Sequence, residues 1–283
     1  MIRKKHLNPL KHPQGDFFIA DILDAMPKDD LASMEHPLFA LKAGDKRNRK
    51  YEHNGVVVEI KPNNDGCATI HDKDVWIYCI SQLMEAINRG RFDVSRTVRF
   101  TAYDFLITTN RRTDGDSYNR MADAMRRLSG TRIETNIETD GKRERHGFGL
   151  IDSWSVVERD NDNRMVAVEV TLPEWLFRSI KAKHLLTLSP DYFRIRKPLD
   201  RRIYEIARKH CGKQPKWEIG LKNLLLKTGS TAPIRNFKIA IKSLIESNDL
   251  PDYRISYEDE TDKVIFYKRG IKGHQALIND LFD

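Results

Sequence analysis

The sequence has few cysteines and no long apolar run, and each shortage excludes a class of protein. Its 283 residues include three cysteines, Cys67, Cys79 and Cys211, none in a CxxC pair. So sparse a set favours a reducing compartment over a disulfide-built domain. No stretch approaches the roughly 18 apolar residues of a membrane span, and no apolar signal segment follows the basic N-terminus. We therefore expect a soluble cytoplasmic protein with no membrane partner.

Motifs for catalysis and cofactor binding are also missing. The chain has no GxxxxGK[ST] phosphate loop, no HExxH and no HxH metal pair among its nine histidines. Lys227-Thr228-Gly229 matches the KTG of penicillin-interacting enzymes, but no SxxK supplies a nucleophile, so a helix-ending turn is the better interpretation. Acids such as Asp16, Asp21 and Asp24 fit a solvated surface better than a metal site. These absences predict a non-enzymatic protein without cofactor or metal.

Acidic residues are scarce in one long segment, which makes the charge distribution asymmetric. Hydrophobic residues form 40% of the chain, enough for a sizeable core, and the net charge is +8. Residues 178–245 contain 17 Lys and Arg but only four Asp and Glu, a net charge of +13, so the rest of the chain carries about −5. A cationic face of this kind predicts an anionic partner, with nucleic acid favoured. The alternative is a solvated basic surface without a partner.

The first half of the chain has the order of helices and strands that is typical of a winged helix. The expected elements are a helix at 72–88, a strand at 97–100, a helix at 102–109 capped by Thr101, a helix at 118–128 capped by Ser117 and ended by Gly130, and strands at 132–139, 149–157 and 165–172. Asp140-Gly141 is a hairpin signal. Because the pattern changes from a period of 3.6 to a period of two after Gly130, the hairpin at 132–149 is interpreted as the wing.

The segments before this pattern are less regular. Residues 1–15 are expected to form a flexible basic arm, and DFFIADILDAM a short helix ended by Pro27. DKRNRK at 45–50 is interpreted as a loop, GVVVEI at 55–60 as a strand, and residues 68–70 as a further short strand. The segment 16–41, with Phe17, Phe18 and Phe39, and the first winged helix are candidates for self-association as a homodimer.

The same order recurs in the second half. Helices are expected at 199–210, at 221–227 before Gly229, and from a cap at Ser230 or Thr231, with Pro233 in the first turn, to Ser247; strands are expected at 216–219, 253–257 and 263–268. The last two strands flank the acidic turn EDETD and form a second wing. The predicted fold class is therefore α+β, with tandem winged-helix domains at 16–172 and 199–270. A connector at 173–198 with a helix at 174–181 joins them, and 271–283 is a tail.

The third helix of each unit carries the candidate DNA contacts. In the second unit an apolar face (Ile234, Phe237, Ile241, Leu244 and Ile245) lies opposite Arg235, Asn236, Lys238 and Lys242. The first unit offers Asn119, Arg120, Arg126 and Arg127 on its helix and Lys142, Arg143 and Arg145 at the expected wing tip. Arg, Lys and Asn can bind phosphates or base edges in the major groove. Each basic face could also be solvated and without a partner.

Long blocks of the sequence resemble a known family. They are DFFIADILDAMPKDDLASMEHPLFALKAGDKR, ATIHDKDVWIYCISQL, RTVRFTAYDFLITTNR, GTRIETNI, GFGLIDSW, VEVTLPEWL, LTLSPDYFRIRKPLDRRIYEIARKHCG and KTGSTAP. Together they span roughly residues 16–270 and resemble the replication initiator protein A (RepA) family of proteobacterial plasmids. The resemblance implies a bacterial protein that binds repeated sequences in double-stranded origin DNA. It also implies opening of an adjacent AT-rich region, contact with host replication proteins such as the helicase and its loader, and repression of its own promoter as a dimer.

Two other functions remain open on the residues alone. One is a winged-helix transcriptional regulator without initiator activity, which composition cannot distinguish from an initiator. The other is an enzyme such as a relaxase or nuclease, which the missing metal and nucleophile motifs disfavour. The family blocks and the second wing favour the initiator.

Overall fold

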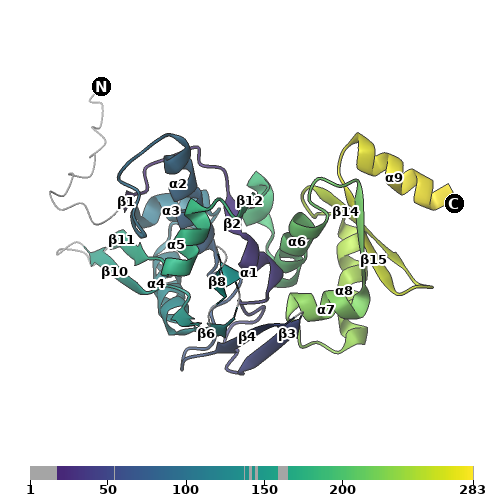
Figure 1. The fold of residues 1–283 in the computed structure, drawn as a ribbon, viewed down its shortest axis with the longest axis horizontal. Coiled ribbons are helices and arrows are strands. Elements are labelled where there is room, and N and C mark those ends of the chain that lie inside the picture. The colour runs from purple at the N-terminus through teal and green to yellow at the C-terminus, as the bar shows by residue number, and fades with distance from the viewer. Residues whose placement is uncertain are drawn as a thin grey trace.

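The computed structural model describes residues 18–282, except positions 54, 137, 140–141, 144–145 and 159–164. The predicted basic arm at 1–15 lies outside the described residues. In Figure 1 the N-terminal half lies on the left and the C-terminal half on the right, and helix α1 (Leu31–Glu35) lies beside α6 (Pro198–His210) between them. The mixed α+β class is as predicted.

The N-terminal half contains one three-helix unit with its own sheet. Its elements are α2 (Asp74–Asn88), β5 (Thr97–Thr101), α3 (Ala102–Thr108), α4 (Gly115–Gly130), β10 (Ser153–Glu158) and β11 (Met165–Thr171). Strand β11 pairs antiparallel with both β5 and β10, and β1 (Phe18–Ile19) pairs parallel with β5 at the sheet's edge. The Thr101 side chain accepts from the Asp104 backbone N–H, which confirms the predicted cap of α3.

The C-terminal half repeats this order. Its elements are α6, β13 (Lys216–Gly220), α7 (Leu221–Thr228), α8 (Ile234–Ser247), β14 (Tyr253–Glu258) and β15 (Lys263–Lys268). Strand β15 pairs antiparallel with both β13 and β14. In both units the strand between the first and second helices therefore pairs with the last strand, which also pairs with its hairpin partner. Helix α7 ends at Thr228, one residue beyond the predicted end, and Gly229 takes the left-handed conformation with φ of 70°.

The hairpin predicted as the first wing belongs to a different sheet. Strands β3 (Arg49–His53), β4 (Val56–Lys61), β6 (Arg132–Thr135) and β9 (His146–Gly149) form a sheet in this order, and β6 does not pair with β5 among the described residues. Ile60 lies opposite Ile133 in this sheet, and both are fully buried. The apolar strand β4 thus supplies the partner for β6. The place beside β5 is taken by β11, which also pairs with β10. Both β10 and β11 are predicted from the sequence.

Several other local predictions are wrong. Residues 18–22 are not helical: Phe18, Ala20 and Ile22 alternate into the core, a period of two that suits an edge strand. Strand β3 begins at Arg49, inside the predicted loop. Residues 68–70 form only an isolated bridge, between Ala40 and Thr69.

Two predicted helix caps are also wrong. Helix α4 is capped by Asp114, which accepts from the Ser117 backbone N–H at 3.0 Å and from its hydroxyl at 2.6 Å. The N-cap of α8 is Pro233, with no side-chain capping bond. Ser230 instead accepts from the Ala232 backbone N–H in the preceding turn.

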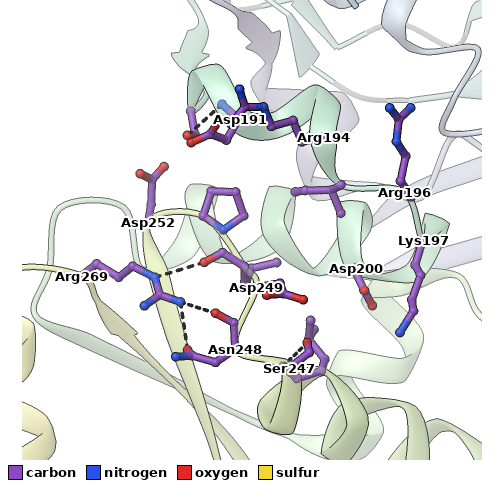
Figure 2. A pocket seen from close by; sticks show the side chains of 15 residues that line it. Asp191, Arg194, Arg196, Lys197, Asp200, Ser247, Asn248, Asp249, Asp252 and Arg269 are labelled. Atoms are coloured by element: carbon purple, nitrogen blue, oxygen red, sulfur yellow. Dashed lines mark hydrogen bonds and ion pairs between the residues drawn. The ribbon is translucent and has the colours of Figure 1, made fainter. Parts of the chain in front are cut away.

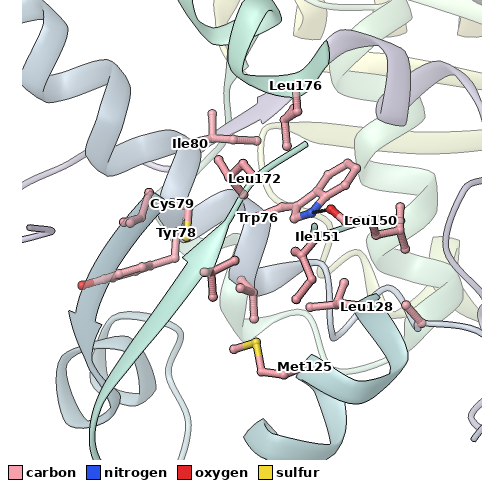
Figure 3. Close-up of a cluster of buried hydrophobic side chains, with 14 of the residues drawn as sticks. Trp76, Tyr78, Cys79, Ile80, Met125, Leu128, Leu150, Ile151, Leu172 and Leu176 are labelled. Carbon is pink, nitrogen blue, oxygen red and sulfur yellow. Dashed lines mark hydrogen bonds between the residues drawn. The ribbon is translucent and has the colours of Figure 1, made fainter. Parts of the chain in front are cut away.

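The first core is built around Trp76 of α2. Its indole N–H donates to the Leu150 carbonyl at 2.7 Å, and buried aliphatic side chains from α2, α4 and the following strands surround it (Figure 3). Phe18 and Phe39 are 0% and 5% exposed and belong to this core. This removes the physical reason for the predicted self-association through these aromatics, and Phe17 lies outside the described residues. Burial of these side chains instead makes the segment 18–41 part of the fold.

The predicted connector packs into both cores and is not a loose link: Leu176 and Ile180 belong to the first core, and Tyr192 and Phe193 belong to the second. Helix α5 (Glu174–Lys181) packs on α2 with Leu176 and Ile180 buried, at the predicted bounds. Strand β12 (Leu185–Thr187) pairs with β2 (Lys28–Asp30), and the 3-10 helix η1 (Pro190–Arg194) follows.

The second core crosses between the halves, since Met34 of α1 and Ile77 of α2 pack with side chains of the C-terminal unit. A buried charge network lies at the same boundary. The Lys73 ammonium lies 2.6 Å from Asp29 and 3.1 Å from Glu205 of α6, and all three side chains are at most 1% exposed. Glu205 also accepts from Arg202 at 3.0 Å and from the Tyr192 hydroxyl at 2.7 Å. Because buried charges need such partners, the network fixes how the halves meet.

The segment predicted as a tail is a helix, α9 (Ile271–Phe282), that packs on β15. Asp280 accepts from Lys216 at 2.6 Å and from the Tyr267 hydroxyl at 2.8 Å. A Cβ atom at Gly273 would lie 1.8 Å from the Lys268 carbonyl oxygen, so only glycine allows this close approach.

Candidate nucleic-acid interface

Helix α8 has one face in the core and the other in solvent. Of the predicted apolar stripe, Phe237, Ile241 and Leu244 are at most 3% exposed, whereas Ile234 at the start of the helix is 39% exposed. At its C-terminal end Arg269 donates to the Asn248 carbonyl at 2.6 Å, where a cation is favourable. The helix is therefore firmly anchored while its outer face stays open.

The outer face of α8 carries the predicted polar residues in two different states. Arg235 and Asn236 are exposed, and within the described part of the chain neither side chain makes a hydrogen bond or ion pair. Lys238 and Lys242 lie 3.1 and 3.2 Å from carboxylate oxygens of Asp259, in the turn after β14. Only the first pair is immediately available to a ligand.

The two lysines also share an aromatic neighbour. Their ammonium groups lie 4.5 and 5.4 Å from the ring centroid of Tyr257. Contacts with Tyr257 and then Asp259 raise the pKa of Lys238 to about 12, so this side chain is charged at neutral pH. A phosphate that binds Lys238 or Lys242 must displace the Asp259 carboxylate.

On α4 the predicted residues are more strongly engaged. Arg127 makes a bidentate pair with Asp72, both distances being 2.8 Å, and is only 21% exposed. Arg126 pairs with Asp123 at 2.6 Å on the exposed surface. The Arg127 pair joins α4 to the start of α2, which makes that side chain part of the fold.

The remaining predicted residues of the first unit are less constrained. Asn119 and Arg120 are exposed, and the Arg120 guanidinium lies 3.9 Å from Asp116, a contact too long for a strong pair. Lys142 and Arg143 form the short strand β8, which pairs with β7 (Glu138–Thr139), away from the sheet of β5, β11 and β10. Arg145 lies outside the described residues.

A comparison of the two third helices identifies a residue that the sequence reasoning missed. The buried residues Met121, Met125 and Leu128 of α4 have the same spacing as Phe237, Ile241 and Leu244 of α8. When they are aligned, Asp123 matches Ile239. Ile239 is 60% exposed although it is large and apolar. The available signal was its position outside the apolar stripe, three residues after Asn236.

A cavity of about 710 Å³ lies at the C-terminal end of α8, beside the start of α6 and η1 (Figure 2). Its charged lining mixes both signs: Asp191, Arg194, Arg196, Lys197, Asp200, Asp249, Asp252 and Arg269. Arg194 pairs with Asp191 at 2.9 Å, and Arg196 donates to the Asn110 carbonyl. Because acids balance the cations, this cavity is a weaker candidate for DNA than the open face of α8.

The described residues contain no group of three His, Cys, Asp or Glu side chains placed to hold a metal ion. In the same part of the chain no helix has the length and apolar character that crossing a membrane requires.

Comparisons with known proteins define the class to which this fold belongs. RctB domains 2 and 3 share the fold: two crystal structures of them align with TM-scores of 0.59 and 0.57 at 10% identity. These alignments cover 84% and 87% of this chain and 96% and 99% of the RctB chains. By fold, the chain is therefore an α+β protein of two units, arranged as in RctB domains 2 and 3.

The family follows from sequence similarity. The family description "Replication initiator protein A" matches residues 28–255. A protein of Wigglesworthia glossinidia brevipalpis, provisionally named as a replication protein, is 48% identical over 257 residues, which cover 90% of this chain and 94% of the relative. This chain belongs to the replication initiator protein A family.

Proposed function

We propose that the chain is a plasmid replication initiator that binds repeated sequences in double-stranded DNA at its plasmid's origin. The observation that carries the proposal is the family match over residues 28–255. A protein that starts replication must find one place on a long DNA, and sequence in a duplex is read mainly from its grooves. The chain offers an exposed, anchored, cationic helix for this purpose in α8.

We further propose that both units are winged helices. In each, three helices precede a β-hairpin, and the strand between the first two helices completes the sheet. The wings are then β10–β11 and β14–β15, and the third helices α4 and α8 are those that would enter the major groove. This assignment replaces the hairpin at 132–149 as the first wing.

The proposed contacts follow from exposure and pairing. Arg235 and Asn236 of α8 are the base-reading candidates, and Lys238 and Lys242 are phosphate-binding candidates once Asp259 is displaced. Asn119, Arg120 and Arg126 of α4 remain candidates. Arg127 is better explained by its pair with Asp72. Lys142 and Arg143 would act from the hairpin of β7 and β8, and Arg145 stays a candidate outside the described residues.

The remaining functions are inferred from the family. The protein would act in the bacterial cytoplasm, promote opening of the origin, recruit host proteins such as the helicase and its loader, and repress its own promoter as a homodimer. It would do so without catalysis, cofactor or metal. The exposed side chains of Arg235 and Asn236, which make no hydrogen bond or ion pair in the described part of the chain, support this proposal. The absence of a catalytic motif from the sequence supports it as well.

Footprinting on the parent plasmid tests the central proposal. The full chain should protect several direct repeats beside the origin, whereas a transcriptional regulator would protect one promoter palindrome. Affinity should fall with salt by roughly 0.9 log unit per log unit of salt for each phosphate contacted. Supercoiled origin DNA incubated with the protein and Mg²⁺ should stay unnicked. A single protected palindrome, a flat salt response or nicking would each contradict the corresponding part of the proposal.

A further inference from the structure

The outer face of α8 has a large apolar side chain at its centre. Ile239 is 60% exposed and lies outside the buried apolar stripe of the same helix. On a helix, residues three and four positions apart are neighbours, so Ile239 lies beside Arg235 and Asn236 on one side and Lys242 on the other. A single exposed isoleucine is ordinary on a protein surface. Its position among three groups suited to DNA is what carries the inference.

The major groove has one apolar group that such a side chain can contact. Each base pair presents hydrogen-bond donors and acceptors there, and thymine also presents its 5-methyl group. Asparagine pairs well with adenine N6 and N7, so Asn236 could bind the adenine of a nearby A·T pair. The cations around Ile239 complement the phosphates on either side of the groove, which favours DNA over an apolar protein surface as the occupant of this face.

We propose that Ile239 contacts the 5-methyl group of a thymine in the major groove and so selects A·T at one position of each bound repeat. The inference rests on the proposed function and adds a base identity to it. The first unit would not read thymine in this way, because the matching residue on α4 is Asp123, a carboxylate paired with Arg126 at 2.6 Å. Thymine selection would therefore belong to the second unit alone.

Replacement of thymine by deoxyuridine removes the methyl group and leaves the hydrogen-bonding edges unchanged. The probe is the duplex that the purified full chain selects from a random-sequence library, resynthesised with one thymine at a time replaced. We expect one replacement to weaken wild-type binding about fourfold, the effect of one exposed methyl group. Ile239→Ala should bind the unmodified duplex about three- to tenfold more weakly and should be indifferent to that replacement.

Leu226→Ala is the matched control. Leu226 is 66% exposed on α7 and lines a cavity beside Glu35 and Tyr51, away from the outer face of α8. It should keep the wild-type response to every replacement. Melting of both variants should stay close to wild type, because each residue is exposed.

Three results would overturn the inference. The first is that no thymine replacement weakens binding. The second is that wild type and Ile239→Ala are equally sensitive to the same replacement. The third is that Ile239→Ala binds the unmodified duplex with wild-type affinity. The last result would leave Ile239 free for a protein partner. Failure of the proposed function looks different: the full chain would select no sequence from the library at all.

Discussion

The two units of this protein share one arrangement of helices and strands but differ in the outer faces of their third helices. Both place a strand between the first and second helices and complete the sheet with a hairpin. Their third helices share the spacing of three buried residues, Met121, Met125 and Leu128 in α4 and Phe237, Ile241 and Leu244 in α8. The outer faces differ. Arg126 and Arg127 of α4 are paired with acids of their own unit, whereas Arg235 and Asn236 of α8 have no such partner among the described residues.

This difference shows that basic residues on a helix do not by themselves form a basic surface that a ligand can reach. The arginine–aspartate pair between α4 and Asp72 stabilises the first unit and removes Arg127 from solvent. Beside the row on α8 the acids are Asp259 and Asp262, which come from the turn between β14 and β15 and not from the helix. We infer that the first unit chiefly supports and positions the second unit, and that the second unit recognises the DNA sequence.

The largest expected effect comes from the charge network that joins the units. Lys73→Met would leave the carboxylate of Asp29 buried without its cation and that of Glu205 with Arg202 alone. The free energy of unfolding should fall by about 3–5 kcal/mol in chemical denaturation. Lys61→Met, which breaks a surface pair with Glu134, is the control and should cost less than about 1 kcal/mol. Two separate transitions in the wild type would show that the network does not couple the units.

Truncation of one buried residue in each third helix tests whether both helices contribute similarly to stability. Phe237→Ala should lower the free energy of unfolding by about 3–5 kcal/mol and Met125→Ala by about 2–5 kcal/mol, because both side chains are buried and leave cavities. DNA binding should be lost as a consequence of unfolding. If Phe237→Ala melts like wild type but fails to bind DNA, α8 is not anchored as described.

Two half-buried histidines of the N-terminal half, His36 and His71, should make stability depend on pH. Burial lowers the pKa of His36 and of His71 to about 4. Between about pH 4 and 6.5 the unfolded chain therefore binds more protons than the folded chain, and the free energy of unfolding rises with pH. His71→Gln should flatten this rise in denaturation at several pH values.

The control for the pH effect is His274→Gln on the exposed face of α9, which should keep the wild-type profile. Burial raises the pKa of Asp29 to about 7 and so lowers stability as pH rises over the same range. The comparison is therefore made between variants and wild type at each pH. A His71→Gln profile parallel to wild type would contradict the assignment.

The smallest effect tests the acid that holds the lysines of α8. Asp259→Asn should free Lys238 and Lys242 and raise affinity for a scrambled duplex several-fold, with less change for the selected duplex. Glu260→Gln changes the net charge equally in the same turn and is the matched control. Equal effects of the two variants would show that only net charge matters, and that the Asp259 contacts do not.

The elements with strong periodicity were predictable from sequence. Helices α2, α3, α4, α6, α7 and α8 and the hairpin of β14 and β15 lie close to where their patterns place them. The anchoring of α8 by Phe237 and Ile241 followed from the same apolar spacing. These features depend on residues close in the chain, which is why local patterns reveal them.

The rest depends on long-range pairing that a local pattern does not encode. The strand at 132–135 alternates correctly, but nothing in its own residues says that it pairs with β4 and not with β5. The segment at 18–22 is compatible with a helix in sequence because Ile19, on the outward side, is apolar like Phe18, Ala20 and Ile22, and this hides the period of two. Arg127 and Asp72 are far apart in sequence, so their pair was invisible until the fold placed them together.

The most direct test compares Arg235→Ala with Arg120→Ala in the full chain, by thermal melting and by affinity for selected and scrambled duplexes. Both should melt close to wild type, since exposed substitutions usually change stability within about 0.5 kcal/mol. Arg235→Ala should weaken binding to the selected duplex by about 1–3 kcal/mol and relax its sequence preference. Arg120→Ala should weaken both duplexes alike, as a phosphate contact would. If Arg235→Ala binds the selected duplex like wild type while Arg120→Ala loses the preference, α4 is the reader and the account is wrong.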